Sequence, residues 1–98
     1  MVKINWTYEA QTWLRDIYNC IATDNPDAAQ NTIAGIFNKA QLLADHPQLG
    51  HRYEAETSRE VRILLYGHYR IAYLIRSDRN IDVLGVFHGA LNIERYLV

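Results

Sequence analysis

The sequence predicts an α+β domain in which a two-helix hairpin covers one face of an antiparallel sheet. In the first half, two stretches carry apolar residues at the three- and four-residue spacing of amphipathic helices. Residues 58–88 then hold three runs of Val, Ile, Leu and Tyr, separated by Gly67-His68 and by residues 77–80, which is typical of strands joined by hairpins. The expected order is strand, helix, helix, three or four strands and a short tail, in a single domain spanning residues 1–98.

Composition excludes several classes of function. The chain has 98 residues and a formal net charge of -1, so no overall charge favours nucleic acid or a membrane surface. It contains no apolar run long enough to cross a bilayer and no secretory signal at its start, so we expect a cytoplasmic protein. Cys20 is the only cysteine, and its place in a helical pattern predicts a small buried thiol.

The first half begins with alternation of apolar and polar residues over residues 2–6, which predicts a short half-buried strand. Thr7 offers an N-cap for the first helix. The apolar stripe of that helix consists of Ala10, Trp13, Leu14, Ile17, Tyr18 and Ile21.

A second helix follows after a linker of only a few residues, so the two helices should form an antiparallel hairpin. Asn25 can cap it, and Pro26 is tolerated at the first helical position. Its stripe consists of Ala29, Ile33, Ile36, Phe37, Ala40, Leu43 and Ala44. Pro47 disfavours helix at His46 and ends the run.

The second half starts with a turn at residues 47–50. Residues 51–57 are mostly polar and fit either an irregular loop or a short edge strand. The three-stranded meander comes next, and residues 90–98 fit a short helix or a tail. Because the helices cover one face of the sheet, we expect the other face to be open and to carry the function.

Arg70 is the polar residue that fits this sheet least well, since it interrupts an apolar strand. It must face solvent, pair with an acid or serve a site. Cleavage of RNA at a 2′-hydroxyl needs a base, an acid and a cation, and Glu54, His88 and Arg70 could fill these three roles. In the structural interpretation, Arg70 pairs with a surface carboxylate and His88 merely ends a strand. No motif indicates a metal or a cofactor.

The register of the strands decides between these alternatives. A regular register gives three cross-strand pairs: Arg76 with Ile81, Arg70 with Phe87, and Tyr69 with His88. Arg70 and His88 then lie on opposite faces of the sheet. A shift of one residue or a β-bulge would bring them to one face.

The chain resembles the RelE/ParE superfamily of bacterial toxins from type II toxin–antitoxin modules. The resemblance rests on six short strings in order: 6–7 (Trp-Thr), 25–29 (Asn-Pro-Asp-Ala-Ala), 46–50 (His-Pro-Gln-Leu-Gly), 59–60 (Arg-Glu), 69–73 (Tyr-Arg-Ile-Ala-Tyr) and 86–90 (Val-Phe-His-Gly-Ala). It implies a strand–helix–helix–strands fold and, as in plasmid stabilisation systems, a cognate antitoxin that neutralises the toxin. Operator DNA would be bound only through the antitoxin, and no membrane is involved.

The branches of this superfamily differ in target. RelE-like and YoeB-like members cleave mRNA in the ribosome, whereas ParE-like members inhibit DNA gyrase by binding. Arg70 matches the arginine of the nuclease branches, and His88 and Glu54 could match the YoeB-like histidine and glutamate. However, Val61 and Ile63 stand where RelE-like enzymes have catalytic lysines.

The end of the sequence also departs from the RelE-like pattern. Leu91 replaces the arginine found in RelE and many ParE members, and Leu97 stands near the RelE tyrosine. The ending His88-Gly89-Ala90 is ParE-like. The resemblance therefore favours a gyrase inhibitor. A ribosome-dependent endoribonuclease that uses Arg70, His88 and Glu54, and a remnant that has lost toxicity, remain the alternatives.

Overall fold

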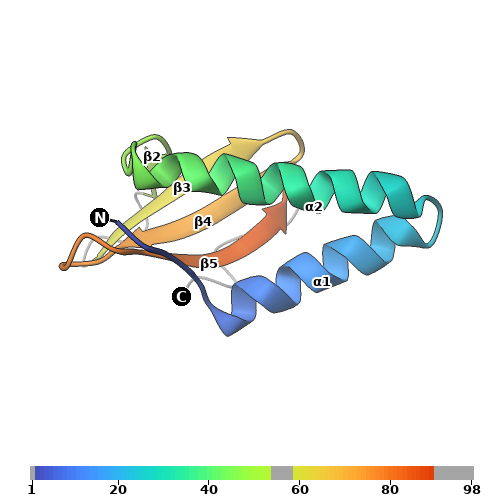
Figure 1. Ribbon diagram of the computed structural model, residues 1–98. Coiled ribbons are helices and arrows are strands. Elements are labelled where there is room, and N and C mark those ends of the chain that lie inside the picture. Colours follow the sequence, from blue (N-terminus) through green and yellow to red (C-terminus); the bar gives the residue numbers. More distant parts are fainter. Residues whose placement is uncertain (1, 54–58, 90–98) are drawn as a thin grey trace.

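Two layers build the structure, a five-stranded sheet and a pair of helices on one of its faces (Figure 1). The computed structural model describes residues 2–53 and 59–89. The helices are α1 (Tyr8–Ala22), α2 (Pro26–Gln41) and a short 3-10 turn, η1 (Leu42–Ala44). The strands are β1 (Ile4–Trp6), β2 (His51–Arg52), β3 (Glu60–Tyr66), β4 (Tyr69–Ile75) and β5 (Ile81–His88). The predicted α+β class and helix hairpin are confirmed.

Both helices begin at the caps that the sequence predicts. The Thr7 hydroxyl accepts a 3.2 Å hydrogen bond from the Ala10 N–H, and it also donates at 2.7 Å to the carbonyl oxygen of Val83 on β5. Thr7 therefore ties the start of α1 to the sheet as well as capping it. Asn25 accepts a 3.1 Å bond from the Ala28 N–H, with Pro26 as the first residue of α2.

The strand order in the sheet is β1-β5-β4-β3-β2. The meander of β3, β4 and β5 is antiparallel, as predicted, and β2 extends it antiparallel at one edge. At the other edge β1 pairs with β5 in parallel. This parallel pair requires a long connection, which here consists of the helix hairpin, η1 and strands β2 to β4. Of residues 51–57, His51 and Arg52 form an edge strand, and residues 54–58 lie outside the described part.

A β-bulge divides the pairing of β4 with β5. Ala72 pairs with Gly85 and Tyr73 with Val83, so Leu84 has no partner on β4. Beyond the bulge, the predicted pairs Arg70–Phe87 and Tyr69–His88 are confirmed.

On the other side of the bulge the predicted register is wrong. Ile81 pairs with Ile75, not with Arg76. The reason is the extra residue at Leu84, which moves the register by one position along β5.

Both faces of the sheet carry buried apolar residues. The face toward the helices holds the larger cluster: Ala10, Ile36, Leu43, Leu64, Ile71, Tyr73, Ile81, Val83 and Val86. The opposite face holds Ile63, Ala72 and Phe87, which are 3%, 0% and 1% exposed. The expectation that this face is open is therefore wrong at its centre. The sequences of β3, β4 and β5 are nearly continuous apolar runs, which is typical of strands covered on both faces.

Trp13 links this second cluster to α1, since its ring lies edge-on to Phe87 with centroids 4.8 Å apart. Cys20, expected to be buried, is exposed on α1. The thiol lies outside the helical stripe that packs on the sheet. Neither α1 nor α2, nor any other helix in the described part of the chain, has the length and apolarity of a bilayer-crossing segment.

The turn at residues 47–50 is fastened to the sheet by Tyr73. Its hydroxyl donates a 2.7 Å hydrogen bond to the Pro47 carbonyl and accepts a 2.9 Å bond from the Gly50 N–H. Arg62 donates at 2.7 Å to the Gly50 carbonyl. A Cβ at Gly50 would lie 2.7 Å from the Ile63 carbonyl oxygen, so only glycine allows the turn to approach β3 this closely.

Candidate functional site

Arg70 lies on the sheet face away from the larger core, next to the β3–β4 hairpin. Its cross-strand neighbours are Leu65 on β3 and Phe87 on β5. Its Nη2 donates a 2.7 Å hydrogen bond to the Gly89 carbonyl. In residues 2–53 and 59–89 no carboxylate pairs with it. Within the described residues, Arg70 therefore does not form the ion pair with a surface carboxylate that the structural interpretation predicts.

His88 lies at the end of β5, opposite Tyr69, and is exposed. Directly opposed residues of an antiparallel pair share a face, so His88 is on the helix side of the sheet and Arg70 is on the other side. The His88 ring lies edge-on to Tyr69, with centroids 5.8 Å apart, and nearly parallel to His68 at 6.3 Å. The sheet itself thus separates the two residues that a ribonuclease mechanism would bring together.

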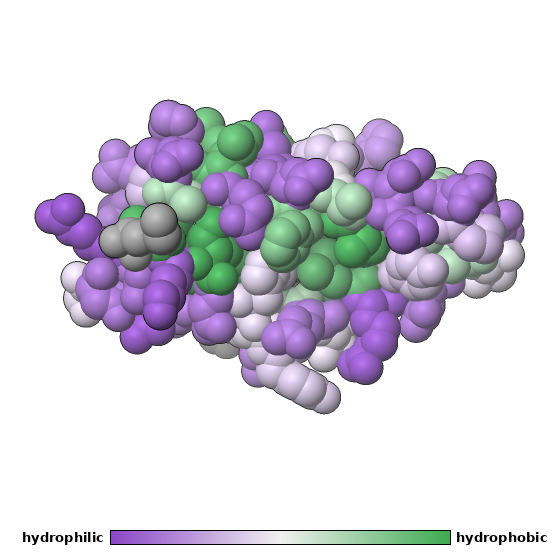
Figure 2. Space-filling model, in the orientation of Figure 1, coloured by the Kyte–Doolittle hydropathy of each residue, from purple (hydrophilic) through white to green (hydrophobic). Residues whose placement is uncertain are grey.

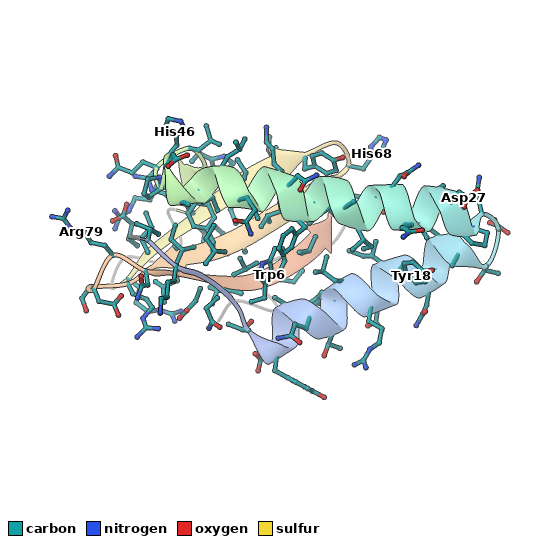
Figure 3. The ribbon with its side chains drawn as sticks, viewed as in Figure 1. Trp6, Tyr18, Asp27, His46, His68 and Arg79 are labelled. Carbon is teal, nitrogen blue, oxygen red and sulfur yellow. The ribbon has the colours of Figure 1, made fainter. Side chains whose placement is uncertain are left out.

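The two side chains still border one recess at the end of the sheet. This hairpin pocket, as we name it, has a volume of about 310 Å³ and is lined by Leu65, Gly67, His68, Tyr69, Arg70, His88 and Gly89. Figure 3 labels His68, which projects from the tip of the β3–β4 turn. Gly67 has a φ of 56°, the left-handed conformation that lets two residues close the hairpin.

The hairpin pocket contains cationic and hydrogen-bond-donating groups but, among its described lining residues, no carboxylate. Glu54, the base predicted from the sequence, lies outside the described residues, as does the tail at residues 90–98. Val61 and Ile63, where the nuclease branch has lysines, are buried apolar side chains at 1% and 3% exposure. The described residues also hold no group of three His, Cys, Asp or Glu side chains able to bind a metal.

Sequence reasoning missed two residues of the hairpin pocket, Leu65 and His68. The sequence predicts His68 only as part of a turn. Leu65 is 57% exposed, although it stands beside the buried Leu64. Strict alternation in a β-strand places Leu65 on the face of the buried Ile63, so the sequence carries no signal for its exposure.

A larger recess of about 890 Å³ lies at the other end of the sheet, where Arg79 is labelled in Figure 3. Its charged lining residues are two carboxylates, Asp45 and Glu60, and two arginines, Arg76 and Arg79, of which Glu60 and Arg76 are in ion pairs. Arg76 contacts Asp78 at 3.3 Å and Asp82 at 3.6 Å, and Arg62 contacts Glu60 at 2.9 Å. Its lining is therefore electrostatically closer to balance than that of the hairpin pocket.

Apolar surface also gathers between α1 and α2, as Figure 2 shows. Phe37 on α2 is 44% exposed and stacks on Trp6 with ring centroids 5.7 Å apart. Tyr8 and Tyr18 on α1 are 75% and 38% exposed. Large exposed aromatics on a helix pair are typical of a protein-binding surface.

Comparison with known proteins points to one family. Residues 4–92 match the family described as "ParE toxin of type II toxin-antitoxin system, parDE". A Sinorhizobium fredii (strain NBRC 101917 / NGR234) protein named "Putative toxin Y4kP" is 34% identical over 87 residues, covering 89% of this chain and 88% of its own. The fold is similar to that in the "Chromosomal ParDE TA system from P. aeruginosa", with a TM-score of 0.74 and 20% identity over 90% of this chain and 96% of that one.

Proposed function

Since this chain belongs to the ParE toxin family of type II toxin–antitoxin systems, we propose that it inhibits DNA gyrase by binding and that a cognate antitoxin neutralises it. It would act in the bacterial cytoplasm and reach operator DNA only through the antitoxin. The proposal requires a binding surface and no bond-breaking chemistry.

The placement of Arg70 and His88 on opposite faces of the sheet supports this choice over ribonuclease activity, although both side chains border the hairpin pocket. General acid–base catalysis needs its groups within hydrogen-bond reach of one reacting centre. The strand register points Arg70 and His88 to opposite sides of the sheet. The apolar burial of Val61 and Ile63 supports the same conclusion, since no lysine is available there to stabilise a phosphorane-like charge.

The helix pair supports the antitoxin part of the proposal. Phe37, Tyr8 and Tyr18 expose aromatic surface on α1 and α2. An amphipathic helix of an antitoxin can bury such residues as anchors. Substituting Phe37→Ser should then weaken antitoxin binding, measured by calorimetry with the purified product of the neighbouring gene. Unchanged affinity would contradict this assignment of the surface.

The direct test is gyrase supercoiling with the purified chain, with and without the antitoxin. We expect inhibition that the antitoxin relieves. In cells that express the chain alone, incorporation of labelled thymidine should fall before that of labelled methionine. If methionine incorporation falls first and purified ribosomes cleave mRNA in its presence, the endoribonuclease alternative is correct. Normal growth with unaffected gyrase would identify a chain without toxicity.

A further inference from the structure

The hairpin pocket holds a cationic side chain, Arg70, that no carboxylate of residues 2–53 and 59–89 neutralises. Its polar side chains are those of Arg70, His68, His88 and Tyr69. Arg62 on β3 and Arg76, just after β4, both contact carboxylates. Arg70 differs from them because, in residues 2–53 and 59–89, it meets only the Gly89 carbonyl, through Nη2.

A guanidinium has five N–H donors in a planar fork, and Arg70 uses one nitrogen of it within the described residues. The bond to Gly89 holds the fork at the rim of the pocket without neutralising its charge. A carboxylate is the ligand that matches the remaining donors in both geometry and charge.

Leu65 supplies the second feature. It is directly opposite Arg70 in the β3–β4 ladder and is 57% exposed. An exposed leucine beside an arginine that meets no carboxylate within the described residues offers apolar contact next to a charge-assisted hydrogen bond. Protein interfaces commonly combine these two contacts around a central anchor.

We infer that the hairpin pocket is a docking site for an acidic side chain of the protein target, with an apolar neighbour of that side chain packed on Leu65. This inference rests on the proposed function, and the target is therefore gyrase. Nucleic acid fits less well, because binding a phosphate backbone draws on several cations, whereas the pocket holds one arginine and the chain has a net charge of -1.

The test compares two pocket variants with two matched controls outside it. Arg70→Gln removes the charge, and Leu65→Thr removes apolar surface while keeping β-propensity. Arg79→Gln and Leu49→Thr make the same changes at the other end of the sheet, where Leu49 is 46% exposed. Thermal unfolding and antitoxin affinity, measured for all four, show whether each variant is folded.

We expect each pocket variant to need about ten- to a hundredfold more protein for half-inhibition of supercoiling, the loss typical of a hydrogen bond to a charged group or of a buried anchor. The controls should inhibit like the parent chain. Arg70→Lys should fall between the parent and Arg70→Gln, because it keeps the charge and loses the fork.

The possible failures are distinguishable. If the parent chain inhibits gyrase and both folded pocket variants inhibit equally well, the docking site is wrong and the proposed function stands. If the parent chain leaves gyrase untouched, both are wrong. If the pocket variants lose ribosome-dependent mRNA cleavage that the parent performs, the pocket receives RNA and not a protein carboxylate.

Discussion

The Tyr73 hydroxyl donates a 2.7 Å hydrogen bond to the Pro47 carbonyl and so joins the middle of β4 to the turn that leaves the helix layer. The same oxygen accepts the Gly50 N–H at 2.9 Å. Tyr73 is fully buried, so water cannot replace either contact without opening the core.

Replacing Tyr73 with Phe should destabilise the fold, because the Pro47 carbonyl and the Gly50 N–H would lose their shared partner. Leaving a buried polar group unsatisfied costs about 1–3 kcal/mol in mutational series. We therefore expect the free energy of unfolding to fall by an amount of this order. Urea unfolding of the parent chain and Tyr73→Phe measures it. Tyr66→Phe, on the same sheet face, is the control for loss of a tyrosine hydroxyl. An unchanged urea midpoint for Tyr73→Phe would show that the two hydrogen bonds of the Tyr73 hydroxyl do not stabilise the fold.

Alkaline pH should lower the free energy of unfolding of the parent chain more than that of the Tyr73→Phe variant. Burial raises the pKa of the Tyr73 hydroxyl above its ordinary value of 10.0, and the charge of Glu60 acts in the same direction, while the Gly50 hydrogen bond and Arg62 oppose them. Because the folded-state pKa is the higher one, the contribution to stability is complete below pH 10 and is lost as the pH rises toward the folded-state value.

The measurement is the difference in unfolding free energy between the two proteins at pH values from about 8 to 11, which bracket an ordinary tyrosine pKa. We expect the difference to shrink above pH 10 as the unfolded parent ionises. The other tyrosines are common to both proteins and cancel. A difference that stays constant across the range would contradict the raised pKa.

Gly35→Ala should destabilise the chain although alanine favours helix. A Cβ at Gly35 would collide with the Tyr66 ring, whose Cζ atom would lie 2.7 Å away. Overpacking of this kind costs about 1–3 kcal/mol, which exceeds the gain of up to about 1 kcal/mol in helix propensity.

In a Tyr66→Leu background the clash is removed, and Gly35→Ala should be neutral or stabilising. The four proteins form a double-mutant cycle that isolates the contact. Equal effects of Gly35→Ala in both backgrounds would show that contact with Tyr66 is not the reason why position 35 requires glycine.

Arg79→Gly should stabilise the β4–β5 turn. Arg79 has a φ of 73°, in the left-handed region that costs a side-chain-bearing residue roughly 1–2 kcal/mol. Glycine removes this cost but adds roughly 0.5–1 kcal/mol of backbone entropy, so the net gain should be about 0.5–1 kcal/mol in thermal or urea unfolding. Arg79→Lys keeps the Cβ and should leave stability unchanged. Equal gains in both variants would show that the left-handed backbone of Arg79 is not the cause.

Local signals in the sequence were sufficient for the helices. Thr7 and Asn25 cap them as predicted, because a cap depends on residues only a few positions away. The α+β class followed from the contrast between helical spacing and strand runs. The Arg70–Phe87 pair, which follows from a regular register, also occurs, because the bulge at Leu84 offsets the one-residue difference in register beside the β4–β5 turn.

Non-local features could not be obtained in the same way. The parallel pairing of β1 with β5 joins segments that are distant in the chain and leaves no local pattern. The exposure of Leu65 depends on which layers cover each face, and the buried centre around Phe87 depends on Trp13 reaching it from α1. The bulge could not be predicted from the sequence, because its extra residue is Leu84 and not a glycine.

That bulge has a consequence for comparing relatives. Ile81 and Val83 point to the helices on one side of it, and Val86 and His88 do so on the other, because the extra residue at Leu84 inverts the alternation of β5. Deleting Leu84 would remove the bulge and leave Val86 and His88 facing the helices, because their partners on β4 would still be Ile71 and Tyr69. In an alignment with a relative that lacked the bulge, a gap placed after His88 and not at Leu84 would therefore equate residues that lie on opposite faces of the sheet.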